Sequence, residues 1–430
     1  MHVKFTPISR LESKQGFSLS YRSNLTFLLV SIAAVCLSIA GLLWVNQRVA
    51  ASAPGGTDFF VLRNAASSWI FKGVSPYNPS ISQDTFRVIT GREPVPPSKA
   101  DRFAYLSPLY SMAFVVPFSF GDWILSRALW MTFIEICIAA SAFLAVRLSG
   151  WKISLWGSGF VALFAILGYY GLRAIFQGTF SAVAAVFLLA SLVLIEKKHD
   201  MDAGLVLALA SIDLHLSGLL ILFTFFWAIS SRRSQISVGI LIGLAFLTVS
   251  SMVFRPDWPV QWAAALLGAK SVVLSGFSII SGIASHMPGV SQPVSLVLYG
   301  LSGAYLLMEW ILAWGKDDRW YQWTALLTVV MTMMFPLRTT STDVLVTLPV
   351  LFLIFQAWQE RWGKTGQVLA WLGLLIHLGT SWGLFLATTK NGHESLWMLA
   401  IPTLLNLVCL WWVRWWAIHR TRLFFEEFPL

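Results

Sequence analysis

The sequence predicts an all-α protein that crosses a membrane many times, and three observations lead to this fold class. Hydrophobic residues make up 57% of the 430 residues, whereas charged residues make up only 12%. Soluble domains contain about 25% charged residues. Apolar runs of roughly 20 residues, the length of a membrane-spanning helix, recur along the whole chain. An outer-membrane barrel would instead alternate apolar and polar residues in segments of about 10.

The positive charge of the chain is interpreted as a topology signal. The net charge is +10, but the basic residues gather in short loops between apolar runs, as cytoplasmic orientation requires. No DNA- or RNA-binding module is visible, so nucleic acid is excluded as a partner. The three cysteines, Cys36, Cys137 and Cys409, lie inside apolar runs and lack metal-ligand spacing, which argues against a disulfide framework and against a metal site.

The apolar runs define the expected helices. They lie near residues 25–46, 105–119, 123–146, 153–170, 178–195, 201–230, 236–254, 291–314, 320–336, 343–358, 366–388 and 396–417. The run 201–230 is too long for one span and is interrupted by Asp213 and His215, so we expect two short helices that meet at one membrane face. The first run is interpreted as an uncleaved anchor, because it exceeds the apolar region of a typical signal peptide.

The distribution of basic loops predicts which runs cross. If the run 105–119 crosses, three basic loops fall outside the cell; if it does not cross, all of the basic loops fall inside. This run has only about 15 residues and contains Pro108 and Pro117, so we expect a juxtamembrane helix. About 12 crossings result, within one membrane domain.

The same parity assigns the loops and termini. Residues 1–24 and the tail 418–430 are expected in the cytoplasm, whereas the loops 47–122 and 255–290 are expected on the outer face. A long outer loop with its own structure usually carries function. The predicted localisation is therefore the cell membrane, with a site on the extracytoplasmic face.

Asp58 is the first candidate site residue, because it is a carboxylate just beyond the first span. Such a side chain either caps the helix that follows, since Asp is a preferred N-cap residue, or acts as a general base or sugar ligand at the membrane surface. Spacing alone leaves both interpretations open.

Further polar residues occur at the expected outer face. Arg102 and Tyr105 belong to the first outer loop, Arg173 and Gln177 share one face if their segment is helical, and His215 lies at the break of the run 201–230. Alternatively, Arg173 lies at the membrane interface without a functional role, and His215 has a structural role. Near 336–343 a polar gap separates two runs. There Arg338 suits a phosphate clamp or reaches toward the interface, and Asp343 is a candidate ligand or a helix cap.

The order of these pieces resembles the GT-C type of membrane glycosyltransferases, in particular their family 87 of polyprenol-phosphate-mannose-dependent α-mannosyltransferases. The resemblance covers about residues 20–235. It is carried by the outer-loop stretch from Asp58 to Tyr77, by Tyr105-Leu-Ser-Pro108-Leu109, by Gln177-Gly-Thr-Phe, and by Ala203-Gly204-Leu205 before His215. The chain departs from the family pattern in two places, with Gln177-Gly178 where Gly-Gln is usual and His215 where Lys is usual.

The resemblance implies a GT-C-like bundle and a hexosyltransferase of the cell envelope. It implies that Asp58 is the catalytic base and that the donor is a polyprenyl-phosphate sugar, with mannose as the expected hexose and a lipid or glycan as acceptor. Arg102, Tyr105, Arg173, Gln177, His215, Arg338 and Asp343 are the expected substrate ligands. No cofactor is expected; a divalent metal near Asp58 is left as an alternative, although the sequence supplies no ligand cluster for it.

Two other classes stay open at this stage. A transporter or flippase of lipid-linked sugars would use outer cations and a membrane groove equally well, although the internal repeats common in transporters are not evident. A catalytically inactive scaffold of an envelope assembly would account for the two departures at Gln177-Gly178 and His215.

Overall fold

The computed structural model describes residues 16–268, 278–287, 289–335, 339–389 and 394–418. Within these ranges every regular element is a helix. Seven of the described helices are long and apolar enough to span a membrane, or eight if the bent pair Leu155–Leu167 and Tyr169–Gln177 counts as one span. The predicted class, an all-α polytopic membrane protein, agrees with this structure.

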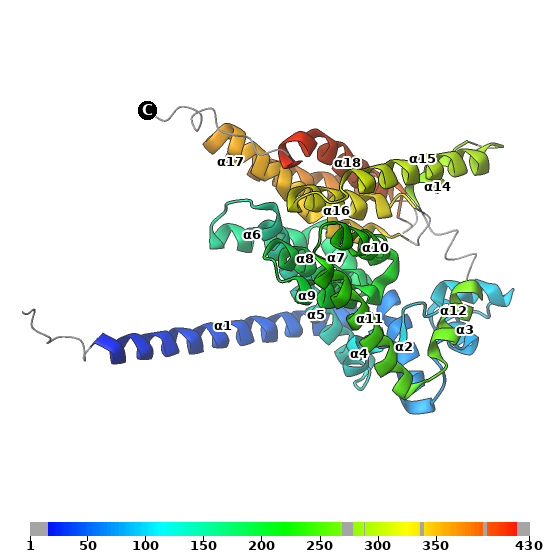
Figure 1. Ribbon diagram of the computed structural model, residues 1–430. Coiled ribbons are helices and arrows are strands. Elements are labelled where there is room, and N and C mark those ends of the chain that lie inside the picture. The colour runs from blue at the N-terminus through cyan, green and yellow to red at the C-terminus, as the bar shows by residue number, and fades with distance from the viewer. Residues whose placement is uncertain (1–15, 269–277, 288, 336–338, 390–393, 419–430) are drawn as a thin grey trace, which may run out of the picture.

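The first helix reaches far beyond the rest of the molecule. Figure 1 shows α1 (Gly16–Ser52) as a long rod that leaves the bundle. Apolar side chains such as Val30 and Leu37 are more than half exposed along it. Lipid is the solvent that such a surface requires. Near its end, α1 contacts α5 (Trp123–Ser149), where the Asn46 amide donates to Glu135 at 2.9 Å.

The centre of the bundle is formed by α5 and its neighbours. Helix α6 (Leu155–Leu167) is followed by α7 (Tyr169–Gln177), which is bent from it by 58°. Helix α8 (Ser181–Glu196) then packs against α5. Most of the buried side chains of α8 are Ala, Val and Leu, with Ser181, Ser191 and Ile195 among the rest, so small residues allow close contact on several sides. The short α7 therefore ends inside the molecule, near the beginning of α2 (Thr57–Lys72).

Residues 200–230 fold back on themselves. Helix α9 (Asp200–Leu209), the 3-10 turn η4 (Ala210–Asp213) and α10 (Leu214–Ser230) follow one another without a loop. Asp200 nevertheless pairs with Arg233, which comes just after the end of α10. Both ends of the segment therefore lie together, and η4 forms its tip. This agrees with the expectation of two short helices that meet at one face.

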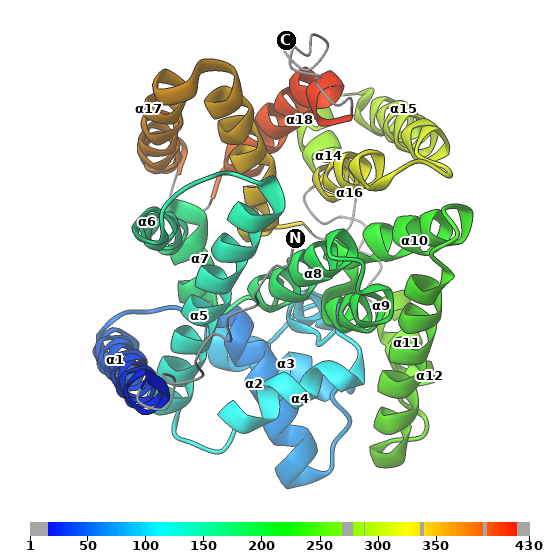
Figure 2. The same cartoon turned by 60° about the vertical axis from the view of Figure 1, so that its left-hand side comes forward.

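Helix α17 (Leu348–Thr388) is also a hairpin (Figure 2). It turns at Gly363, whose φ of 56° and ψ of −126° are not helical. The two arms then approach so closely that a Cβ on Gly366 would lie 1.9 Å from the Trp358 carbonyl oxygen. The runs 343–358 and 366–388 are thus two separate arms, as expected. The first arm follows η5 (Ser341–Thr347).

The remaining long helices complete the wall of the bundle. They are α11 (Ser234–Phe254), α15 (Ser291–Leu312), α16 (Asp318–Thr332) and α18 (Trp397–Ile418). Helix α11 lies against α9 through small residues, because a Cβ on Gly204 would come within 2.2 Å of the Ile236 carbonyl oxygen. The Gly239–Gly243 pair on α11 takes part in the same contact, as small residues do where helices approach closely in membranes.

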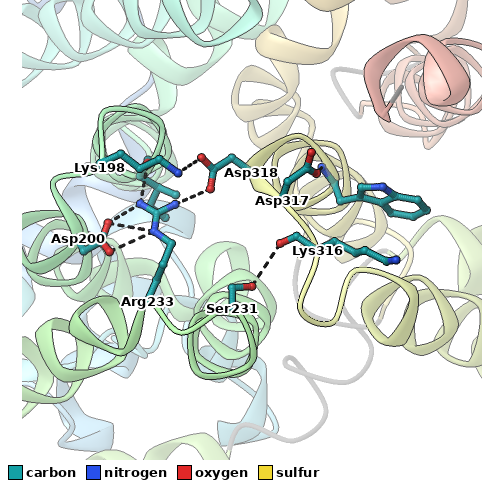
Figure 3. A network of polar contacts seen from close by, with 9 residues as sticks. Lys198, Asp200, Ser231, Arg233, Lys316, Asp317 and Asp318 are labelled. Carbon is teal, nitrogen blue, oxygen red and sulfur yellow. Dashed lines mark hydrogen bonds and ion pairs between the residues drawn. The ribbon is translucent and has the colours of Figure 1, made fainter. Parts of the chain in front are cut away.

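Loops expected in the cytoplasm meet at one end of the bundle, which we call the charged end. Figure 3 shows Arg233 of the 231–233 turn bonded to Asp200 and Asp318, while Lys198 also pairs with Asp318. The Arg233 Nη1–Asp318 Oδ1 distance is 2.6 Å. The 147–152 loop joins the same end, because Gln322 donates to the Leu148 carbonyl.

The polar loop after α1 forms a cap at the opposite end, which we call the cavity end. It contains α2, α3 (Pro79–Thr90), η1 (Pro97–Phe103), η2 (Leu109–Ser111), α4 (Met112–Val115) and η3 (Val116–Phe118). The apolar segment Leu109–Phe118 has 10 residues, too few to cross about 30 Å of hydrocarbon. This supports the interpretation of 105–119 as a segment that does not cross.

The two loops expected on the outer face touch each other. Helix α12 (Trp258–Gly268) belongs to the loop 255–290, which also contains α14 (Ile279–Ala284). The Trp262 indole donates to the Leu106 carbonyl at 2.8 Å, and Gln261 is hydrogen-bonded to Ser75. Because α12 contacts the first loop at two points, both loops lie at the cavity end.

Candidate functional site

A cavity of about 650 Å³ opens at the cavity end between the first loop and the helical bundle. Five of the residues singled out from the sequence line it, namely Asp58, Arg102, Tyr105, Gln177 and His215. They come from α2, η1, the segment after η1, α7 and α10. Apolar side chains complete the wall, including Leu214, Leu219 and Leu222 of α10 and Leu266 of α12. The cavity thus combines charged groups with a surface suited to a hydrocarbon chain.

Asp58 does not cap its helix. Helix α2 begins at Thr57 after Gly56, which occupies the N-cap position with φ 80° and makes no side-chain cap bond. Asp58 is therefore the second helical residue, where a carboxylate is stabilised by the positive end of the helix dipole. The alternative of an N-cap role for Asp58 is wrong, because the glycine before Thr57 takes that position.

The start of α2 is fixed against the end of α7. The Gly56 N–H donates to the Phe176 carbonyl at 2.7 Å, and Phe59 stacks on Trp130 with ring centroids 5.0 Å apart. The Trp130 indole in turn donates to the Gly178 carbonyl at 3.0 Å. These bonds place Asp58 and Gln177 on adjacent parts of the cavity wall.

A buried arginine holds the turn before α2. Arg127 of α5 is 2% exposed, and its Nη1 donates to the Ala53 carbonyl at 2.7 Å. Its Nη2 donates to the Pro54 carbonyl at 3.3 Å. The planar guanidinium provides several donors in a fixed arrangement, so one side chain satisfies successive carbonyls at the end of α1. Sequence reasoning did not single out Arg127, because it lies inside an apolar run.

Tyr105 and Arg102 come from the segment that closes one side of the cavity. The Tyr105 phenol is 3% exposed and donates to the Pro108 carbonyl at 3.1 Å. Burial raises the pKa of Tyr105, while its hydrogen bond with Ser111 acts in the opposite direction. Its hydroxyl therefore stays neutral. The guanidinium of Arg102 lies over the Phe103 ring, 4.7 Å from the centroid, and supplies a cation to the cavity.

His215 lies between two carboxylates. Its Nδ1 pairs with Asp213 in the preceding turn, and its Nε2 lies 3.3 Å from Asp343 Oδ2. Asp213 and His215 both line the cavity. Asp213 itself was noted only as a helix break, although the Asp-x-His spacing at a turn is a signal for such a pair. Two carboxylates against one imidazole leave this group without excess positive charge.

Asp343 lies behind His215 and is buried. Its Oδ1 accepts from the Ser181 hydroxyl at 2.6 Å, and its Oδ2 accepts from the Thr340 N–H at 2.8 Å. Thr340 is the N-cap of η5 and Asp343 its third residue, so the pair forms a capping box. The N-cap is thus Thr340 and not Asp343, which is the N3 partner of the capping box, while its side chain also joins α8, α10 and η5.

Arg173 stands outside the cavity wall. It pairs with Glu394, with 3.6 Å between Nε and Oε2, and Glu394 also accepts from the Tyr169 hydroxyl at 2.6 Å. With its amide oxygen turned toward Arg173, Gln177 accepts from that guanidinium at 2.9 Å. Arg173 thus orients Gln177 from behind. Arg338 lies outside the described residues.

Metal-binding geometry is not found in the part of the chain that the structure describes, where no group of three or more His, Cys, Asp or Glu side chains is arranged to hold an ion. Comparisons of the chain with family models, with curated proteins and with solved structures found no match. The functional argument therefore depends on the geometry of the cavity.

Proposed function

We propose that the protein is a GT-C-like membrane glycosyltransferase that moves a hexose from a polyprenyl-phosphate donor to a lipid or glycan acceptor. The observation that carries this proposal is the convergence of Asp58, Arg102, Tyr105, Gln177 and His215 on one cavity. Five segments of the chain supply these residues. Mannose is the hexose that the sequence resemblance suggests.

The proposed fold is a bundle of about 12 passes, in line with the basic loops. Several contacts support this number beyond the helices counted by length. The hairpin α9–η4–α10 starts and ends at the charged end, because Asp200 pairs with Arg233. Helix α17 also turns back on itself, since its two arms are in close contact at Gly366. We count each arm as one pass, with η4 included in the first arm of the first hairpin, residues 200–213. Both termini are proposed to be cytoplasmic and the cavity extracytoplasmic.

The cavity suits a donor with a hydrocarbon tail. Leu214, Leu219 and Leu222 of α10 form an apolar stripe on the cavity wall, and Leu214 and Leu222 are also exposed on the surface. A polyprenyl chain along this stripe would place its phosphate and sugar near Arg102 and Gln177. Keeping both reactants in place accounts for a large part of the rate gain in transfer reactions.

Asp58 is proposed as the general base. Its carboxylate takes the proton of an acceptor hydroxyl while that oxygen bonds to the anomeric carbon, and the bond between this carbon and the phosphate oxygen breaks. The electron pair leaves with the polyprenyl phosphate. Arg102 stabilises the charge of the leaving group, and Gln177 contacts sugar hydroxyls, whereas Tyr105, whose hydroxyl is bonded to Pro108 and Ser111, contributes its ring to the wall.

The expected phosphate site differs from the one suggested by the sequence. Arg173 is paired with Glu394 away from the cavity wall, and His215 is balanced by Asp213 and Asp343. Arg102 lines the cavity together with Asp58, and its guanidinium lies over the Phe103 ring. We therefore assign the phosphate contact to Arg102 and the ordering of Gln177 to Arg173.

Asp58→Asn tests the proposal. Loss of the base should reduce transfer from polyprenyl-phosphate mannose by roughly 10²–10⁴-fold, with little change in stability. Asp84→Asn is the matched control, because Asp84 is exposed on the same loop and pairs only with Arg87 in the described structure. A well-folded Asp58→Asn protein that transfers mannose at the parental rate would show that Asp58 is not the base. Lipid-linked sugar transport that survives the substitution would favour a flippase, and an unaltered envelope phenotype would favour a scaffold.

A further inference from the structure

A second cavity of about 620 Å³ lies beside the first at the cavity end. It is bordered by the turn between α2 and α3, by the end of η1 and by α12. Ala104 and Tyr105 line both cavities, so one short segment of chain separates them. We call this space the polar cavity and the first one the donor cavity.

Helix α12 presents a different face to each space. Gln261, Ala264 and Gly268, spaced three or four residues apart, line the polar cavity. Trp262 and Leu266 line the donor cavity instead. Because residues three and four apart share one side of a helix, α12 stands between the two spaces. The bond from Trp262 to the Leu106 carbonyl fixes it against the separating segment.

Two tyrosines stiffen this separating wall. The rings of Tyr77 and Tyr105 are 5.6 Å apart and tilted by 45°. The Tyr77 hydroxyl donates to the Ser107 carbonyl at 3.0 Å, as the Tyr105 hydroxyl does to Pro108. Burial raises the pKa of Tyr77, so both phenols are neutral donors whose hydroxyls point away from the polar cavity. The Tyr77 ring is left as an aromatic surface on its wall.

The walls of the two cavities have different chemistry. The polar cavity has Asp101, Arg255, Gln261 and Ser82 on its wall, and none of its described lining residues is Leu, Ile, Phe or Met. Its apolar surface comes from Val74, alanines, prolines and tyrosine rings rather than from the long aliphatic side chains that would line a hydrocarbon chain. Within the part of the chain that the structure describes, the Asp101 carboxylate has no hydrogen-bond or ion-pair partner. A few polar groups around an aromatic face are what a small polar ligand needs.

We infer that the polar cavity is the acceptor subsite, and that the acceptor is a water-soluble carbohydrate rather than a lipid. The inference rests on the proposed function. The acceptor sugar lies against Tyr77 with its hydroxyls toward Asp101 and Gln261, and the reacting hydroxyl meets Asp58 at the rim where the two cavities adjoin, beside Ala104 and Tyr105. The two substrates therefore approach from opposite sides of α12, the donor from the lipid and the acceptor from water.

Filling the polar cavity tests this assignment in the full chain. Ala264→Trp places an indole in the polar cavity, whereas Ala263→Trp adds the same group one residue away, at an exposed position that lines neither cavity. Asp101→Asn is a milder second variant. Each protein is supplied with polyprenyl-phosphate mannose, and donor consumption is measured alone, with soluble methyl mannoside and short oligosaccharides, and with polyprenol or diacylglycerol.

The expected result is a split between two reactions. Soluble sugars should accelerate donor consumption in the parent and in Ala263→Trp, and Ala264→Trp should reduce this acceleration by roughly tenfold or more, the loss of about one good contact. Slow hydrolysis of the donor by water should persist in all variants. The inference would be overturned if only lipid acceptors, or none of the acceptors, accelerated donor consumption. It would also be overturned if soluble sugars accelerated donor consumption as much in Ala264→Trp as in the parent.

A binding measurement separates this inference from the proposed function. A photoreactive mannoside that carries a diazirine should label peptides from residues 73–82 or 255–268, and labelling should fall in Ala264→Trp. Labelling elsewhere, or none above background, counts against the polar cavity whether or not the donor is consumed. Labelling of these peptides in a protein that leaves the donor intact would instead overturn the proposed transferase activity and keep the carbohydrate site.

Discussion

Gly178 lies so close to Phe59 that a Cβ on residue 178 would come within 2.6 Å of the Phe59 Cβ. Gly178 ends α7 in the left-handed region, with φ 74°. Phe59 follows Asp58 in the first turn of α2. One glycine therefore sets how closely the end of α7 approaches the residue proposed as base, and the Gln177-Gly178 order has a steric reason in this chain.

Gly178→Ala should move α2 away from α7. The added methyl meets both an unfavourable backbone conformation and the Phe59 contact, so we expect a loss of about 1–3 kcal/mol beyond the backbone effect. Transfer should fall as well, because displacements of about 1 Å cost up to 10²-fold. Gly91→Ala is the control, since Gly91 has φ 67° but no atom near a Cβ. Equal apparent Tm values for the two variants would contradict the close contact.

The buried Asp343 should be needed as a charged acceptor. Both of its oxygens accept hydrogen bonds, from Ser181 and from Thr340, and His215 lies beside the second oxygen. In Asp343→Asn one acceptor becomes an NH₂ group that faces donors, which should cost about 1–3 kcal/mol. Thermal unfolding in detergent measures the loss. Asp202→Asn, on the exposed first turn of α9, should change little, and a similar shift for both would argue against the bonds of Asp343 with Ser181 and Thr340.

The positions of helices and chain reversals were predictable from the sequence, whereas the direction of side chains was not. The break at Asp213 and the separate runs on either side of Gly363 follow from polarity and run length, so α9–η4–α10 and α17 were expected as pairs of helices. Asp58, Tyr105 and Gln177 line one cavity, and the roles that the resemblance implies for them stay predictions.

Other features depend on contacts between distant residues. Arg173 was expected at the phosphate but is bound to Glu394, more than 200 positions later in the chain. The roles of Arg127 and Trp262 depend on carbonyl groups of other segments. No local pattern shows such partners. The sequence placed α12 only within a loop expected on the outer face. The different roles of its two faces become visible only in the structure, where a cavity lies on each side of it.

The charged end should depend on the geometry of Arg233 as well as on its charge. Arg233 is bonded to Asp200, Asp318 and the Ile195 carbonyl (Figure 3). Arg233→Lys keeps the charge but not the planar set of donors, so we expect a loss of about 1–3 kcal/mol. The exposed neighbour Arg232 provides the control as Arg232→Lys. Apparent Tm values in detergent check this, and an unchanged midpoint for Arg233→Lys would mean that charge alone is sufficient.

The effect of pH on this network has a definite sign. Burial lowers the pKa of Arg233, but the Asp200 and Asp318 carboxylates outweigh it and raise the pKa above the ordinary arginine value. A raised pKa in the folded state stabilises the protein below that pKa and is lost only when pH passes it. The difference in Tm between the parent and Arg233→Lys should therefore stay constant from neutral to moderately alkaline pH. A difference that disappears near pH 8 would contradict the network.

The last prediction concerns the two ends of the bundle. The loop 47–122 and the 231–233 turn lie at opposite ends, so single cysteines in them should differ in their access from outside the cell. The background would lack Cys36, Cys137 and Cys409. A membrane-impermeant maleimide should label Ser98→Cys in intact cells, because Ser98 is exposed and lies in the loop 47–122, which is expected on the outer face.

Arg232→Cys should react only after the membrane is permeabilised, since the basic turns are expected to stay in the cytoplasm. Gly121→Cys provides the decisive comparison, because it follows the segment Leu109–Phe118, whose length of 10 residues is too short to cross about 30 Å. Residues 98 and 121 should then be labelled from the same side. Labelling of 98 from outside and of 121 only from inside would mean that the segment 105–119 crosses after all. Every later helix would then change its direction, and the basic turns would face the outside.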